Sequence, residues 1–303
     1  MAVYVVGDFL RETRLRKGYT QEEVSYGICT PASLSRIENG MQKPGRLILE
    51  KLFERLGTEN NLFNSFVSKE EMELYLEIQT LIRNVTDGDL HRIEEQIDIV
   101  EKLTQNASEL ERQSLFWAKG ELATQKYGNN GEAMEYLMKA IQITLPDFDG
   151  KSPLRNHLLT FDEITIINSI AVRHGDNGDL LTAIQLDMWL KEYMENKIID
   201  GRMKTAKYPM ILYNLSYWLG EENCHNEALK MAEQGVDFCV KYGNLPAFPI
   251  LIFNQGAALA ELERYDEAKK CFLQSITIFE AMKKPSQVQT AIDWCREHYK
   301  IEF

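Results

Sequence analysis

One stretch in the C-terminal third carries the spacing of two helices that pack closely together. It is FNQGAALAELERYDEAKKCFLQSI, residues 253–276. Gly256 lies on the first expected helix, and Ala268 and Phe272 lie on the second, so a small residue stands where the helices cross and a large apolar one between them. Such a hairpin cannot bury its hydrophobic face alone and becomes stable by stacking on further copies. We therefore expect the chain to contain more hairpins of this kind.

Three weaker copies precede this stretch. They align on a small residue of the second helix, because Ala133, Ala183 and Ala228 stand where Ala268 stands. Successive copies lie 40 to 50 residues apart, and the extra residues fall in loops. The pattern resembles the tetratricopeptide repeat, and no strand pattern of useful length interrupts it. We expect an all-α chain, with about five hairpins and a capping helix over residues 67–303, wound as a right-handed superhelix with a concave inner face.

The N-terminal segment has a different pattern, that of two short helices joined by a tight turn. TQEE at residues 20–23 is a capping box for the first helix. Thr30 is a good N-cap for the second helix, and Pro31 is a good first residue. Leu34 and Ile37 can pack inward, which leaves a polar outer face. This arrangement is typical of a helix-turn-helix, whose second helix enters the major groove of DNA.

The outward-facing residues of the second helix and its surroundings predict the contacts with double-stranded DNA. The Arg36 guanidinium can donate two hydrogen bonds to a guanine edge, and Ala32 can contact a thymine methyl group. Gln21, Ser33 and Lys43 can donate to phosphates.

Arg14, TQEE at residues 20–23 and SRIENG at residues 35–40 give the segment a family resemblance. With these residues it resembles the λ-repressor-like (Xre-type) helix-turn-helix family. The resemblance implies that Arg14 and Glu38 form a structural ion pair inside the domain. We expect this domain and its linker to cover residues 1–66. A helical hairpin used for dimerisation is the alternative, but the ordered set of motifs favours DNA binding.

Charge is distributed so that an acidic protein can still bind DNA. The whole chain has a net charge of −12. Residues 1–57 hold nine Lys or Arg and seven Asp or Glu, a net of +2, which leaves −14 for the remainder. The repulsive charge therefore lies outside the predicted DNA-binding segment, where we expect it to limit non-specific DNA binding.

The inner lining of the repeats supplies candidate ligand-binding residues. Asn168, Asn214 and Asn254 each lie 14 or 15 residues before the aligned alanine of their copy. A side-chain amide donates and accepts at once, so it can hold a peptide backbone without reading its side chains. Tyr217, one turn from Tyr213, can supply an aromatic ring on which a ligand stacks. Hydrogen bonds from these asparagines to neighbouring helices, and core packing of Tyr217, are the alternatives.

An Xre-type helix-turn-helix followed by tetratricopeptide hairpins resembles the RRNPP superfamily of peptide-pheromone receptors, above all its PlcR-like branch, over nearly the whole chain. The resemblance implies a cytoplasmic homodimer whose DNA affinity or DNA-binding geometry changes when a short imported peptide binds. It also implies that Asn168 and Asn214 hold the peptide backbone. The expected operator is near-palindromic, with half-sites about 34 Å apart. Two alternatives are a repeat domain that inhibits a protein partner and a phage-type repressor without a ligand.

Other functions have little support. The five histidines are scattered and Cys224-His225 is a lone pair, so we expect no metal and no cofactor. No nucleophile motif appears, and we expect no enzymatic activity. The five cysteines form no C-x-x-C pair, which favours reduced thiols in a cytosolic protein. The N-terminus does not have the pattern of a signal peptide, and the uncharged stretch 242–260 contains two prolines, so we expect no membrane segment.

Overall fold

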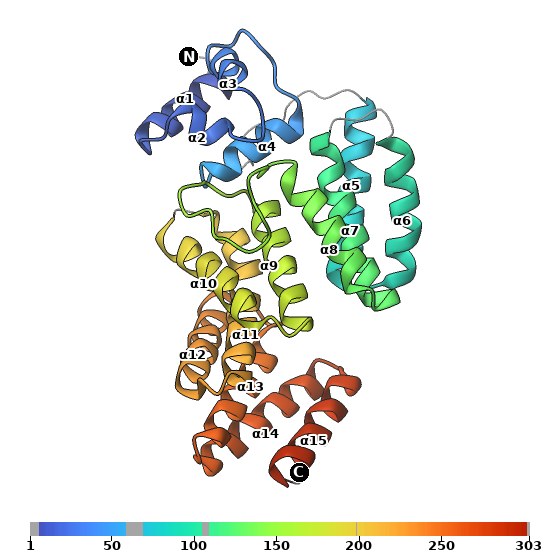
Figure 1. The fold of residues 1–303 in the computed structure, drawn as a ribbon, viewed down its shortest axis with the longest axis vertical. Coiled ribbons are helices and arrows are strands. Elements are labelled where there is room, and N and C mark those ends of the chain that lie inside the picture. The colour runs from blue at the N-terminus through green and yellow to red at the C-terminus, as the bar shows by residue number, and fades with distance from the viewer. Residues whose placement is uncertain (1–5, 59–68, 105–108, 198, 302–303) are drawn as a thin grey trace. The chain divides into compact units, whose positions relative to one another are not determined.

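A computed structural model describes residues 6–58, 69–104, 109–197 and 199–301, and the regular elements in these ranges are α-helices (Figure 1). In chain order they are α1 (Val6–Arg16), α2 (Gln21–Ser25), α3 (Pro31–Glu38), α4 (Arg46–Arg55), α5 (Lys69–Asp87), α6 (Leu90–Leu103), α7 (Glu109–Tyr127), α8 (Asn130–Gln142), α9 (Phe161–Asp176), α10 (Leu180–Asn196), α11 (Gly201–Glu221), α12 (His225–Tyr242), α13 (Phe248–Glu261), α14 (Tyr265–Ala281) and α15 (Pro285–Tyr299). The predicted all-α class is confirmed.

The helices form two compact units. Unit 1 comprises Met1–Gly178 and Lys197–Asp200, and unit 2 comprises Asp179–Asn196 and Gly201–Phe303. The N-terminal helices α1–α4 therefore belong to the same compact unit as the repeat helices α5–α9. The boundary predicted between residues 66 and 67 lies outside the described residues, and that division stays a prediction.

The N-terminal helices α1–α4 enclose a small hydrophobic core. Leu10, Val24, Leu34 and Phe53 are fully buried in it, one from each helix. The Thr20 capping box and the Thr30 N-cap are formed as predicted. Leu15 is 57% exposed. Leu10 and Arg14 occupy the buried face of α1, and the helical repeat turns the residue after Arg14 away from it.

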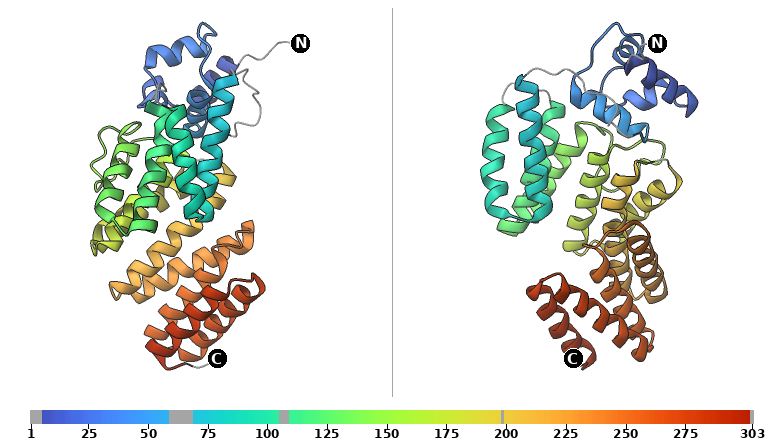
Figure 2. Two further views of the ribbon diagram at one scale, coloured as in Figure 1. Left: turned by 90° about the vertical axis from the view of Figure 1, so that its right-hand side faces the viewer. Right: turned by 180° about the vertical axis from the view of Figure 1, so that it is seen from behind.

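In unit 1, α5 packs on α6 and α7 packs on α8. In unit 2, α11 packs on α12 and α13 packs on α14, and the single helix α15 follows (Figure 2). The aligned alanines Ala133, Ala183, Ala228 and Ala268 are all buried, as the repeat pattern predicted. A Cβ added to Gly256 would lie 2.8 Å from the Phe272 ring, so only glycine allows α13 and α14 to approach this closely.

Helix α15 covers the end of the last pair. The Trp294 ring packs at 5.2 Å from the Phe253 ring and at 6.2 Å from the Phe272 ring, and Cys295 is fully buried. The predicted capping role of this helix therefore has a physical basis in its aromatic contacts.

Candidate functional site

The helix predicted to read DNA presents one exposed face. The Thr30 hydroxyl accepts from the Ser33 backbone N–H at 3.1 Å and caps the helix, and Pro31 is its first residue. Leu34 is fully buried and Ile37 nearly so. The exposed outer face of α3 carries Pro31, Ala32, Arg36 and Asn39, with Ser33 half-buried beside them.

Arg36 on this face is held by the turn that follows α3. Gly40 has φ = +69°, and this left-handed turn lets the Met41 and Gln42 backbone N–H groups donate to the Arg36 carbonyl at 2.8 and 3.2 Å. The Gln42 side-chain oxygen accepts from Arg36 Nε at 3.1 Å, and Ser33 Oγ accepts from Arg36 Nη2 at 3.3 Å. These two bonds engage one edge of the guanidinium, and the remaining N–H donors suit a guanine edge.

Arg14 and Glu38 lie in contact inside the helix-turn-helix. Arg14 Nε donates to Glu38 Oε1 at 2.6 Å and Nη2 donates to Oε2 at 2.8 Å, a bidentate pair. The two side chains are only 9% and 1% exposed. Hydrogen bonding to Glu38 raises the pKa of Arg14, and Arg14 also donates to the Tyr19 carbonyl. The pair thus ties the end of α1 and the turn after it to the end of α3.

Two further residues predicted to contact DNA lie in different settings. Gln21, half-buried at the start of α2, donates one amide N–H to Glu38 Oε2 at 2.7 Å, and its amide has a second N–H that can donate. Lys43 is exposed in the segment between α3 and α4. The structure thus brings Ala32, Ser33 and Arg36 together on α3 and places Gln21 on α2 against Glu38.

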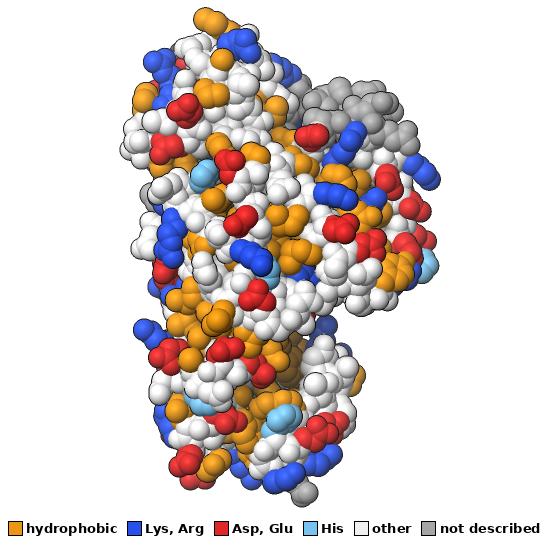
Figure 3. All heavy atoms as spheres, viewed as in Figure 1, with side chains coloured by type: hydrophobic (Ala, Val, Ile, Leu, Met, Phe, Trp, Pro, Cys, Tyr) orange, Lys and Arg blue, Asp and Glu red, His pale blue; other side chains and the backbone are white. Residues whose placement is uncertain are grey.

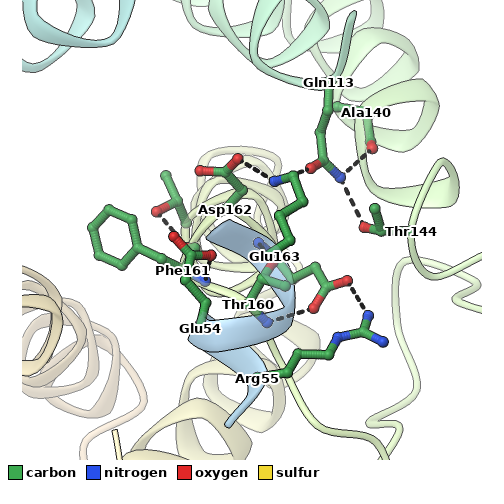
Figure 4. A network of polar contacts seen from close by, with 11 residues as sticks. Glu54, Arg55, Gln113, Ala140, Thr144, Thr160, Phe161, Asp162 and Glu163 are labelled. Carbon is green, nitrogen blue, oxygen red and sulfur yellow. Dashed lines mark hydrogen bonds and ion pairs between the residues drawn. The ribbon is translucent and has the colours of Figure 1, made fainter. Parts of the chain in front are cut away.

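Unit 1 also contains a buried polar cluster that the sequence did not reveal, called here the α4–α9 junction (Figure 4). Its members are Lys51, Glu54 and Arg55 on α4, Gln113 on α7, and Asp162 and Glu163 on α9. Lys51 Nζ donates to Asp162 at 2.6 Å and to Gln113 at 3.0 Å. Arg55 Nη2 donates to Glu163 at 2.7 Å, and both of these side chains have no exposed surface.

The junction is fixed further by the helix cap and by the repeats. Glu163 accepts from the Thr160 backbone N–H at 2.6 Å as part of the α9 capping box, so one carboxylate serves the cap and Arg55. Gln113 donates to the Ala140 carbonyl at 3.0 Å and to Thr144 Oγ1 at 2.8 Å. The side-chain oxygen and nitrogen of Gln113 are thereby both hydrogen-bonded, as burial of an amide requires.

Acidic groups outnumber basic groups in the junction. Burial and the neighbouring carboxylates together shift the pKa values of its members. Burial raises the pKa of Glu54 to about 8, and the charge of Asp162 adds to the rise. Burial also raises the pKa of Glu50. Burial alone would lower the pKa of Lys51, but Asp162 and the other carboxylates raise it above its ordinary value. Lys51 therefore keeps its charge near neutral pH, while Glu54 keeps a proton.

We expect the protein to lose stability as the pH rises through the range in which Glu54 titrates. The pKa of Glu54 is higher in the folded state, at about 8, than its ordinary value of 4.5, so the folded state binds the extra proton between these values. The free energy of unfolding should therefore fall between pH 5.5 and 8.5. Urea unfolding at both pH values, in wild type and in Glu54→Gln, checks this. An equal fall in both proteins would contradict it, because Glu54→Gln fixes the neutral form.

The turn between α2 and α3 is also packed against unit 1 repeat residues. The Tyr26 hydroxyl donates to Asp147, and its ring lies 4.6 Å from the His157 ring. Arg55 donates to the Tyr26 carbonyl. A Cβ at Gly27, which has φ = +66°, would overlap the backbone of Thr144. The segment just before α3 is therefore held by the loop between α8 and α9.

The predicted peptide contacts in unit 2 are engaged with neighbouring helices. Asn214 on α11 is 7% exposed, and its amide donates to Asp187 on α10 at 3.0 Å. Asn254 on α13 donates to the Ser216 hydroxyl at 2.7 Å and to the Tyr213 carbonyl at 3.3 Å. These are the inter-helix bonds that were the alternative to ligand binding. They engage amide N–H groups, and each amide also has an oxygen that can accept.

Tyr217 and Asn168 complete the predicted set. Tyr217 on α11 is 50% exposed, so core packing does not account for its position. Residues 208–220 around it carry no charged side chain. Hydrophobic side chains also gather on the face of unit 2 that Figure 3 shows. Asn168 is half-buried on α9 in unit 1, next to Ser169, which accepts from the Trp117 indole at 3.1 Å.

Two further classes of site are not seen in the part of the chain that the structure describes. Within those residues, no group of three or more His, Cys, Asp or Glu side chains is placed to hold a metal ion. None of the helices in the same ranges is long and apolar enough to cross a membrane.

Comparison with known proteins agrees with this architecture. Residues 10–59 match the helix-turn-helix family model, and residues 251–281 match a tetratricopeptide repeat model. Over 63 residues the chain is 38% identical to YqaF of Bacillus subtilis, an uncharacterized HTH-type transcriptional regulator. That match covers 20% of this chain and 83% of YqaF.

Among solved structures, the chain is similar to PlcR of Bacillus thuringiensis. The complex of PlcR with the peptide PapR7 and DNA superimposes with a TM-score of 0.64 at 17% identity, covering 96% of this chain and 99% of PlcR. The apo form gives a TM-score of 0.59 at 16% identity, covering 95% and 98%. The chain therefore has a helix-turn-helix followed by tetratricopeptide-like repeats in the PlcR fold, as its sequence predicted.

Proposed function

Because the chain belongs to the HTH-type transcriptional regulators, which are DNA-binding proteins and not enzymes, we propose that a short signalling peptide controls its DNA binding. In this proposal α3 reads a specific duplex sequence and the repeat helices bind the peptide, as in a quorum-sensing receptor of the RRNPP type. The observation that carries the proposal is the PlcR fold along nearly the whole chain, combined with an exposed α3 face on which Arg36 is already oriented.

The DNA contacts follow from the geometry of α3. Gln42 and Ser33 hold one edge of the Arg36 guanidinium, so the opposite N–H groups donate to O6 and N7 of a guanine. Ala32 contacts a thymine methyl group, and Ser33 and Lys43 contact phosphates. Gln21 donates one amide N–H to Glu38 and is proposed to donate the other to a phosphate.

Arg36→Ala is expected to weaken specific DNA binding by about 1–3 kcal/mol and to relax base preference at one position of each half-site, because a bidentate guanine contact is lost. Selection from a random duplex library, followed by anisotropy on the selected site, measures both effects. Arg16→Ala is the matched control, since Arg16 is an exposed arginine on α1 rather than on α3. Unchanged base preference in Arg36→Ala would exclude Arg36 as the base-reading residue.

The peptide contacts are proposed for asparagines and one tyrosine on the first helices of the repeats. The Asn214 amide is oriented by Asp187, and its oxygen accepts from a peptide N–H. Asn254 is oriented by Ser216 in the same way. Tyr217 stacks on an apolar peptide side chain, which suits its uncharged surroundings. Asn168 on α9 is proposed to hold the peptide backbone as well.

The protein is proposed to act in the cytoplasm as a homodimer on a near-palindromic operator. The two α3 helices would enter successive major grooves about 34 Å apart. The peptide can change DNA binding only if it binds one arrangement of the dimer better than another, and such coupling is typically about 1–3 kcal/mol. A full chain that binds its operator equally with and without peptide would favour a protein partner or a ligand-free repressor.

A further inference from the structure

The α4–α9 junction goes beyond what a DNA-binding domain needs for its own fold. Lys51 and Arg55 project from α4, yet their carboxylate partners Asp162 and Glu163 lie more than a hundred residues away on α9. Removing water from two cations and two carboxylates is costly, and a buried charge that loses its partner is costlier still. The junction therefore favours one alignment of α4 on α9, because any other buried arrangement would leave a charge unpaired.

Each cation of the junction is bonded to two different elements. Lys51 donates to Asp162 on α9 and to Gln113 on α7. Arg55 donates to Glu163 on α9 and to the Tyr26 carbonyl in the turn before α3. If α4 slid along α9, or rotated on it, at least one of these buried bonds would break. The contact thus fixes orientation as well as proximity.

The position of α3, the helix proposed to read DNA, is also fixed by contacts with the repeats. The turn that leads into α3 is held through Tyr26, which donates to Asp147 and packs on His157. The outer face of α3 stays exposed, with Ala32 and Arg36 accessible. Docking of α1–α4 on the repeats therefore leaves the outer face of α3 uncovered.

We propose that the α4–α9 junction determines which spacing between operator half-sites the dimer accepts. This inference rests on the proposed function. A DNA-binding domain on a flexible tether can follow a half-site that moves along the duplex. A domain locked to the repeats cannot, because each added base pair rotates the second half-site by about 35° and moves it along the axis. The repeats, through the junction, then set the distance between the two α3 helices.

Competition binding tests this on duplexes that carry two copies of the selected half-site, with the selected spacer or with one or two base pairs added or removed. We expect the wild-type chain to prefer the selected spacer by about tenfold or more, comparable to the cost of a mismatched base pair. Lys51→Met should reduce that preference to less than about threefold and leave the base preference within each half-site unchanged.

Two further variants make the result decisive. Asp162→Asn removes one charge at a side chain that is 27% exposed, so it tests the junction if Lys51→Met does not fold. Lys119→Met is the matched control, because Lys119 pairs with Glu101 at 2.8 Å between α7 and α6, away from α4. The control should keep the wild-type spacer preference.

The outcomes separate the inference from the proposed function. Junction variants that fold, bind DNA and keep the wild-type spacer preference would overturn the role of the junction. An equal loss of preference in Lys119→Met would also overturn it, because the effect would then not belong to the junction. A wild-type chain that selects no half-site at all would instead contradict the proposed function.

Discussion

Replacement of Glu38 by alanine is expected to lower the free energy of unfolding of the N-terminal helices by about 3–5 kcal/mol, because it leaves a buried arginine without its partner. Glu38 is 1% exposed at its side chain and accepts from Arg14 twice and from Gln21 once. A loss of this size is a large fraction of the stability of a typical domain. Specific DNA binding should be lost together with the fold of α1–α4.

Urea unfolding followed by circular dichroism measures this loss. The double variant Arg14→Met with Glu38→Leu is the informative control, since replacing both members of a buried ion pair by apolar residues is often close to neutral. We expect the double variant to recover most of the stability. A cost below about 1 kcal/mol for Glu38→Ala, the range of an exposed ion pair, would show that the pair is not structural.

Gly27→Ala is expected to destabilise the protein by about 2–6 kcal/mol, because two costs combine at this position. A non-glycine residue at φ = +66° costs about 1–3 kcal/mol. The added methyl group would also overlap the Thr144 backbone, and overpacking typically costs about 1–3 kcal/mol more. The turn before α3 would have to move away from the loop between α8 and α9.

Gly18→Ala provides the matched control for this variant. Gly18 has φ = +75°, but a Cβ there meets no atom within 4 Å, so it reports the backbone cost alone. Thermal and urea unfolding of both variants should show the larger loss for Gly27→Ala. Equal losses in the two variants would contradict the close packing of the turn on Thr144.

Features set by short-range sequence signals were predicted well. The Thr20 capping box and the Thr30 N-cap with Pro31 depend on residues within a few positions of one another. The buried alanines of the repeats were found because the same helical hairpin recurs along the chain.

The α4–α9 junction could not be predicted in the same way. Lys51 and Arg55 lie within an amphipathic helix, where Lys and Arg usually face solvent, and their partners are more than a hundred residues away. One local signal was available, because TFDE at residues 160–163 has the same capping-box form as TQEE at residues 20–23. It predicts the start of α9, but it does not indicate that Glu163 also pairs with an arginine.

The asparagines show where repeat alignment reaches its limit. The alignment placed Asn214 and Asn254 at equivalent positions, and the structure gives both a bond to another helix side chain, Asp187 in one case and Ser216 in the other. Equivalent positions in the repeats thus predict similar surroundings for the two asparagines. They do not tell whether an asparagine bonds to a neighbouring helix or to a ligand. Tyr217 is the more informative position for mutation, because half of its surface is exposed.

Peptide control of DNA binding is tested most directly by fluorescence anisotropy of the full chain on labelled duplex DNA from the region upstream of its own gene. The titration is repeated with synthetic peptides equal to C-terminal fragments of short secreted proteins encoded beside that gene. We expect one peptide to shift the DNA affinity by about 5- to 150-fold. Tyr217→Ala should abolish the shift, and Tyr265→Ala, which alters a tyrosine that is 57% exposed on α14, should retain it. Tight, specific DNA binding that none of these peptides alters would contradict peptide control.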